Sequence, residues 1–186
     1  NHPNFRLFIS NVSEQFKKVF IVPGNHDIGN IYFRKLDIIN HNQHLIKKIV
    51  DDFDNVHYLN QSTYRLNSKY LIAGTILWCH PKISHQTNNY FLGLREHQKQ
   101  VAWIETTLKN HNFLNVIMLT HYVPSFRLIE KKYLKKGIES ASWFATDLEH
   151  LIRKPIYAWL CGHSHSIIDC RINEIYCGIN AYGYRE

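Results

Sequence analysis

Three short stretches of the sequence carry residues whose types and spacing could do chemistry. They are Gly24-Asn25-His26-Asp27, Thr120-His121 and Gly162-His163-Ser164-His165. A neutral imidazole offers a nitrogen lone pair to a metal ion, and an amide oxygen is a further neutral ligand. The sequence therefore predicts a metal site, and its candidate residues are Asn25, His26, His121, His163 and His165.

Each stretch follows an apolar run that is rich in β-branched residues. The runs cover residues 19–22, 116–119 and 156–160, and such runs are typical of buried strands in an α/β sheet. Ligands of open α/β sheets bind beside the carboxyl ends of the strands, so we expect the three stretches to converge there. The alternative is that these are ordinary loop histidines in a chain that has 13 of them. Their shared position after a strand favours the metal site.

Apolar residues at helical spacing predict four helical regions. They cover residues 5–16, 31–53 (one or two helices, with a break at 40–42), 94–108 and 144–152. A polar loop is expected from residue 78 to near Gly93.

Alternating or continuous apolar residues predict further strands and a hairpin. The strands cover 56–59, 63–66 and 70–76, and the hairpin is formed by 167–171 and 174–177. The alternation of strands and helices indicates an α/β fold. Periodicity alone does not separate two packed sheets from one doubly wound sheet.

The three motifs occur in a fixed order, and flanking segments at residues 120–125, 147–149 and 180–184 add to the pattern. In this respect the chain resembles the calcineurin-like metallophosphoesterases, whose later motifs are Gly-Asn-His-Asp/Glu, a single His and Gly-His-x-His. The resemblance implies an α/β fold of two packed mixed β-sheets flanked by helices. It also implies a single domain over residues 1–186.

Two earlier motifs of that family, Asp-x-His and Gly-Asp-x-x-Asp, do not occur in the sequence. Both belong upstream of Gly24, and the chain begins with Asn1 rather than Met. We therefore interpret the domain as N-terminally incomplete, lacking the strands that carry those motifs.

The resemblance also implies roles for individual residues in a centre of two divalent metal ions, such as Mn, Fe or Zn. Asn25, His121 and His163 are similar to ligands of one ion and His165 to a ligand of the other, while His26 is similar to the catalytic histidine. The implied activity of the full-length parent is phosphomonoester or phosphodiester hydrolysis by a metal-bridging hydroxide. The fragment alone is expected to be inactive, and the alternative is an inactive scaffold that acts as a binding module.

The overall charge suits an anionic partner. The formal net charge is +7, which favours a phosphate-ester substrate, either a small molecule or a nucleic acid. Five cationic residues follow His121, and they form either a substrate-attracting rim or a solvated loop: Arg127, Lys131, Lys132, Lys135 and Lys136.

Other residues bear on the substrate and the compartment. His80 and His85 either contact substrate or decorate the surface, and Tyr122 and Tyr182 either stack on a base or pack inside the protein. The four cysteines form no C-x-x-C pair, which favours a reduced, cytoplasmic protein. No apolar run is long enough to span a bilayer, so no membrane partner is expected.

Overall fold

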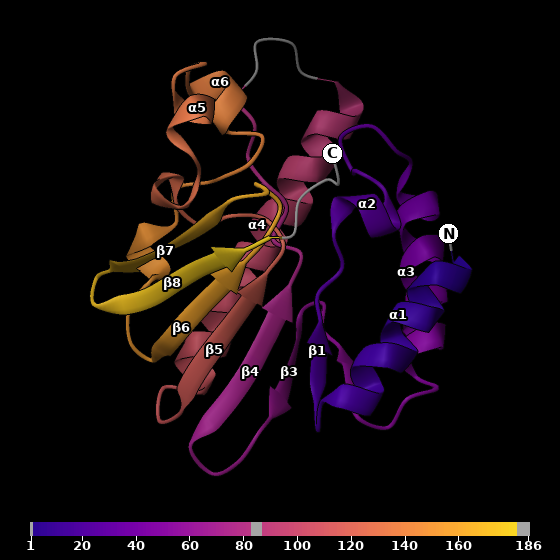
Figure 1. The fold of residues 1–186 in the computed structure, drawn as a ribbon. Helices are drawn as coiled ribbons and strands as arrows, with labels where there is room; N and C mark the ends of the chain where they lie inside the picture. The colour runs from indigo at the N-terminus through magenta and orange to yellow at the C-terminus, as the bar shows by residue number, and fades with distance from the viewer. Residues whose placement is uncertain (1, 83–86, 182–186) are drawn as a thin grey trace.

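A computed structural model describes residues 2–82 and 87–181, with the side chains described from residue 4 onward. In this part of the chain a six-stranded sheet has the strand order β3-β4-β5-β6-β8-β7 (Figure 1). Its strands are β3 (Ser62–Arg65), β4 (Tyr70–Thr75), β5 (Asn115–Thr120), β6 (Ile156–Cys161), β7 (Ile167–Ile172) and β8 (Ile175–Asn180). The four central strands are parallel, and the edge strands β3 and β7 are antiparallel to their neighbours.

A second, two-stranded sheet pairs β1 (Val19–Ile21) with β2 (Val56–Tyr58) in parallel. It packs against the β3–β4 side of the large sheet, where the ring centroid of Phe20 lies 5.2 Å from that of Tyr64. The prediction of two packed sheets flanked by helices is thus confirmed. The smaller sheet is parallel rather than mixed in the described residues.

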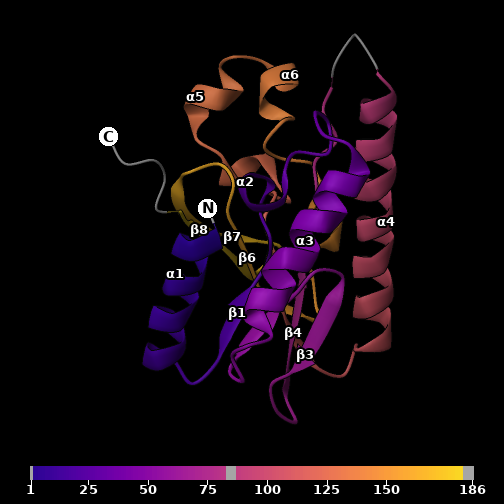
Figure 2. The ribbon, with the colours of Figure 1, turned by 90° about the vertical axis from the view of Figure 1, so that its right-hand side faces the viewer.

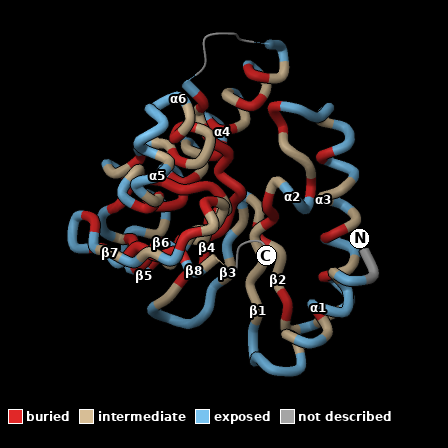
Figure 3. The backbone as a smooth tube through the Cα atoms, turned by 45° about the horizontal axis from the view of Figure 1, so that its top comes forward, coloured by how far each residue is buried: buried red, intermediate tan, exposed pale blue. Residues whose placement is uncertain are grey.

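Helices cover both sheets (Figures 1 and 2). α1 (His2–Gln15) and α3 (Leu36–Val50) lie on the outer side of the small sheet, and α4 (Asn88–Asn110) crosses the back of the large one. Burial is greatest in the large sheet and the helix behind it, where Ile104, Met118 and Trp159 are fully buried (Figure 3). The remaining helical turns are α2 (Asn25–Ile28), α5 (Lys131–Leu134), α6 (Ile138–Ala141), η1 (Phe126–Leu128) and η2 (Glu149–Leu151).

Two of the predicted helical regions have different bounds. The break predicted at residues 40–42 is wrong, because α3 runs without interruption and Asn42 reaches back to donate a hydrogen bond to the carbonyl of Ile28. The loop predicted up to Gly93 is also wrong, since α4 begins at Asn88 and Thr87 caps it by accepting a hydrogen bond from Tyr90 N.

The helix predicted over residues 144–152 is wrong as well. Only the short turn η2 forms there, because the backbone before it pairs with the segment after β5. Ala145 forms a bridge with Val123, whose carbonyl accepts a hydrogen bond from Thr146 N. Backbone N–H and C=O groups that already form hydrogen bonds with a neighbouring segment do not require helical hydrogen bonds.

A search of the described helices finds none long and apolar enough to cross a membrane.

Candidate metal centre

Three of the predicted ligand side chains meet at one point. The Nε2 atom of His121 lies 2.7 Å from Oδ1 of Asn25 and 3.1 Å from Nδ1 of His163. The third side of this triangle, from His163 Nδ1 to Asn25 Oδ1, is also 3.1 Å. The structure thus brings together residues that are up to 138 positions apart in the sequence.

Two of these residues come from neighbouring strands of the large sheet. His121 directly follows β5 and His163 follows β6, and the two strands are parallel, so their carboxyl ends lie side by side. The Gly162 amide donates a hydrogen bond to the carbonyl of His121 over 3.1 Å and ties the two loops together. The side chain of Thr120 is fixed by the indole of Trp159, whose Nε1 donates to Thr120 Oγ1 over 2.9 Å.

The third residue comes from the other sheet. Asn25 is the first residue of α2, which follows β1, so the site lies where the two sheets meet rather than along one sheet edge. A Cβ atom on Gly24 would lie 2.7 Å from Cε1 of His121, so only glycine lets the α2 segment come this close. The carboxylate of Asp27 faces the backbone of this turn and accepts a hydrogen bond from Gly24 N.

The ring of His163 is held in one orientation by its surroundings. Its Nε2–H donates to the carbonyl of Trp143 over 3.2 Å, which leaves the lone pair of Nδ1 directed toward Asn25 and His121. The ring centroid lies 4.0 Å from that of Tyr122 and 5.5 Å from that of Phe144. A carbonyl partner of this kind is typical of a metal-binding histidine.

Burial keeps both histidines neutral. It is the main cause that lowers the pKa of His163 to about 4; electrostatic interaction with His165 and His26 lowers this pKa further, although the hydrogen bond to Trp143 opposes the shift. Burial likewise holds the pKa of His121 well below its usual range, with smaller contributions from His163, His26 and His165. At neutral pH both rings therefore have a lone pair available to a metal ion.

His26 and His165 lie beside this triangle. His26 is exposed on α2, directly after Asn25, and His165 is partly buried two residues after His163. Electrostatic interaction with these two residues is among the smaller causes that lower the pKa values of His121 and His163.

The donor set fits one cation. Asn25 Oδ1 and His163 Nδ1 are both acceptors, and a single proton on His121 Nε2 cannot form good hydrogen bonds to both at once. A cation at the centre of the three atoms would be bound by all of them, and imidazole nitrogen with an amide oxygen suits a borderline divalent ion. All three groups are neutral, and the described residues contain no group of three or more His, Cys, Asp or Glu placed to hold an ion.

Other sequence predictions have mixed outcomes. Tyr122 is only 1% exposed, which confirms packing rather than stacking on a substrate. Tyr182 and His85 lie outside the described residues. His80 is partly buried, with its backbone amide donating a hydrogen bond to Thr146 Oγ1.

The cationic residues after His121 differ in their contacts. Arg127 donates a hydrogen bond to the carbonyl of Arg171, and Lys132 forms an ion pair with Glu130. Lys131, Lys135 and Lys136 are exposed.

Comparison with known proteins finds relatives in sequence and in structure. Protein L509 of Acanthamoeba polyphaga mimivirus is 26% identical over 212 residues, which cover 97% of this chain and 73% of the viral protein. The phosphopantetheinyl hydrolase PptH of Mycobacterium tuberculosis has a similar structure, with a TM-score of 0.63, 12% identity, and coverage of 96% of this chain and 74% of the hydrolase.

The protein TT1561 of Thermus thermophilus also has a similar structure, with a TM-score of 0.52, 12% identity, and coverage of 96% and 69%. Another solved chain gives a TM-score of 0.56 at 11% identity, and this chain spans 62% of its length. At such low identity these similarities show the fold alone. The model of the calcineurin-like phosphoesterase family matches residues 2–166, and the chain therefore belongs to that family.

Proposed function

We propose that this protein is a metal-dependent phosphoric ester hydrolase that acts on phosphomonoesters or phosphodiesters. The observation that carries the proposal is the convergence of Asn25, His121 and His163, in a chain of the calcineurin-like phosphoesterase family, with donor atoms 2.7–3.1 Å apart. When bound, divalent ions would neutralise charge on the phosphoryl oxygens and supply a nucleophile at neutral pH.

The proposed centre is dinuclear. Asn25, His121 and His163 would hold the first ion, and His165, which lies in the same turn as His163, is the proposed ligand of the second. Two divalent cations close together need anionic ligands to offset their charge. The three converging groups are all neutral, so they do not offset the charge of two ions by themselves. The identity of the ions is proposed only as a class, Mn, Fe, Zn or similar.

His26 is the proposed catalytic residue. It is exposed at the start of α2 and directly follows a proposed ligand, so a phosphate ester at the centre would come within its reach. Its imidazole would donate a proton to the leaving oxygen, which is a common role of histidine in general acid–base catalysis. The substrate is proposed as a phosphate-ester small molecule or a nucleic acid, which the net charge of +7 attracts.

A binding module without catalytic activity is the second candidate. The specific observation that favours it is that the described residues contain no group of three or more His, Cys, Asp or Glu placed to hold an ion. Such a module would bind a phosphate ester without hydrolysing it.

The test compares hydrolysis of bis-p-nitrophenyl phosphate and p-nitrophenyl phosphate by the longest natural form of the protein with added Mn²⁺. We expect His26→Ala to lower turnover by about 10²- to 10⁴-fold without lowering metal content. His41→Ala is the matched control, because His41 is exposed on α3 and should leave turnover unchanged.

Three other outcomes are informative. Wild-type turnover by His26→Ala would refute the role of His26. Binding of inorganic phosphate by the metal-loaded protein without turnover would favour the binding module. The 186-residue chain by itself is expected to retain at most one equivalent of Zn²⁺ after dialysis and to be inactive, and two tightly held equivalents would contradict this.

A further inference from the structure

The turn that carries His163 and His165 has an unusual backbone. The φ angles of these residues are +61° and +52°, in the left-handed region, which costs free energy for any residue except glycine. A strained conformation persists only when neighbouring groups hold it in place. Two segments already attach to this turn, since His163 Nε2 donates to Trp143 and Ala181 N donates to the carbonyl of Ser166.

Two buried hydroxyl groups lie inside the same turn. Ser164 is 1% exposed and Ser166 is 2% exposed, and Ser164 Oγ donates to Ser166 Oγ over 3.2 Å. The hydroxyl of Ser166 is shared between the carbonyl of Ser164 at 3.2 Å and Oε1 of Glu130 at 3.4 Å. Buried hydroxyls are costly unless they are paired, so Glu130 completes a chain of hydrogen bonds that begins between the two histidines.

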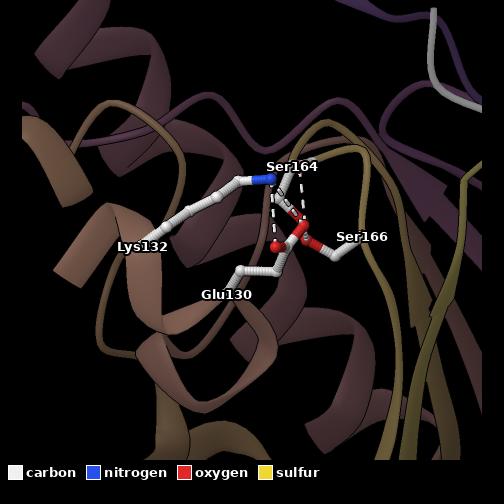
Figure 4. Close-up of polar contacts among 4 residues, drawn as sticks. All are labelled: Glu130, Lys132, Ser164 and Ser166. Atoms are coloured by element: carbon white, nitrogen blue, oxygen red, sulfur yellow. Dashed lines mark hydrogen bonds and ion pairs between the residues drawn. The ribbon is translucent and has the colours of Figure 1, made fainter. Parts of the chain in front are cut away.

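Glu130 is well placed for this contact (Figure 4). It directly precedes α5, and its side chain forms no cap for that helix. Instead its Oε1 accepts hydrogen bonds both from Ser166 Oγ and from Lys132 Nζ, which lies 3.0 Å away. Lys132 is exposed, so the ion pair itself adds little stability.

We propose that Glu130 is a positioning residue: its carboxylate braces the Ser164–Ser166 hydroxyl pair and so fixes the turn that presents His163 and His165. The inference rests on the proposed function only where metal affinity is the readout. Partners outside the ligand shell typically contribute 10- to 100-fold to metal affinity. What Glu130 contributes is a hydrogen-bond acceptor, because Ser166 donates to it.

The test uses two readouts on the 186-residue chain, namely amide hydrogen exchange of residues 162–166 without metal and Zn²⁺ affinity by calorimetry. Glu130→Ala and Ser166→Ala should each speed exchange in the turn and weaken Zn²⁺ binding about 10-fold. Glu130→Gln should stay within about 3-fold of wild type, because its amide oxygen still accepts the hydrogen bond. Glu139→Ala, at an exposed position on α6, is the matched control and should change neither readout.

The variants also separate the brace from general stability and from the proposed function. Lys132→Ala should leave Zn²⁺ affinity near wild type, because the ion pair is exposed. The proposal is overturned if Glu130→Ala matches Glu139→Ala in both readouts, or if Glu130→Gln is as impaired as Glu130→Ala. If the wild-type chain binds no Zn²⁺, the exchange measurement alone decides on the brace, and the proposed function is decided by turnover of the longest natural form of the protein.

Discussion

Gly24 and Gly162 stand at equivalent places in two motifs, yet the structure gives them different roles. A Cβ atom on Gly24 would come within 2.7 Å of Cε1 and 2.9 Å of Nδ1 of the His121 ring. A Cβ atom on Gly162 would find its nearest neighbour, the carbonyl oxygen of His121, at 3.7 Å, which is an ordinary contact. The glycine before Asn25 is therefore needed for close approach, whereas the glycine before His163 is not.

We therefore expect Gly24→Ala to displace the His121 ring and to weaken Zn²⁺ binding by at least 10-fold. Its unfolding free energy should fall by roughly 1–3 kcal/mol, as is usual when extra volume is forced into a packed site. Gly162→Ala is the matched control and should remain close to wild type. Calorimetry with Zn²⁺ and urea unfolding without metal measure the two effects, and equal behaviour of the two variants would refute this account.

The sequence predicted the converging residues because each follows a strand, and parallel strands end at a common edge. That argument applies directly to His121 and His163, whose strands are neighbours. Asn25 follows a strand of the other sheet, a placement that was not predicted, because periodicity did not separate two packed sheets from one. The carbonyl of Trp143 and the carboxylate of Glu130 were not predicted, since they come from segments 20 and 36 residues away that carry no motif.

At the scale of elements, the contact between the two sheets depends on a glycine in β4. A Cβ atom on Gly74 would lie 2.5 Å from Cβ of Leu59 and 3.0 Å from Cγ2 of Val22, at the ends of the two small-sheet strands. Only Pro23 and Gly24 separate Val22 from α2, so this contact also affects how Asn25 approaches His121. Sheet packing and site geometry are thus linked at one position.

Gly74→Ala should separate the sheets and lower the unfolding free energy by roughly 1–3 kcal/mol. Gly178→Ala in β8 is the matched control, because the three atoms nearest to its added Cβ all belong to the side chain of Tyr176, which is 41% exposed. That variant should lose less than about 1 kcal/mol. Urea unfolding of the two variants checks the difference, and similar losses would mean that sheet separation is not the cause.

The strands were predicted better than the helices, for a physical reason. A buried parallel strand is a short apolar run and is visible in the sequence, as in β5 and β6. The segment at residues 144–152 has helical spacing, but its backbone pairs with Val123, a contact that depends on the tertiary fold. Gly93 suggested a loop, yet in α4 it makes room for the ring of Tyr32, which a Cβ atom would approach to 2.3 Å. Tertiary contacts override local preference at these positions.

At the scale of the whole molecule, the small sheet covers only part of one face of the large sheet. Gly74, Leu119, Leu160 and Gly178 lie in one row across β4, β5, β6 and β8, on the same face. Gly74 is buried under the small sheet, but Leu160 is 40% exposed, and Tyr176 on the same face is 41% exposed. Within the described residues β1 pairs only with β2, so its other edge carries unpaired backbone groups.

An apolar sheet face beside an unpaired strand edge favours contacts between molecules. The net charge of +7 opposes such contacts through repulsion, which salt screens. We therefore expect the 186-residue chain to self-associate as its concentration rises. Self-association should be stronger at 0.5 M NaCl than at about 0.05 M NaCl, because the screening length is several times longer at the lower salt concentration and repulsion reaches further. Sedimentation velocity measures this directly.

Substitutions on the open face provide the sharper test. Leu160→Lys combined with Tyr176→Lys adds two charges to the uncovered face and should shift the chain toward the monomer at both salt concentrations. A double variant that adds the same charge elsewhere, Leu7→Lys with Phe113→Lys, is the matched control, because these residues are 62% and 71% exposed on α1 and after α4. Equal dissociation by both variants would show that net charge, rather than the open face, governs association. A wild-type chain that stays monomeric at high salt would contradict the prediction altogether.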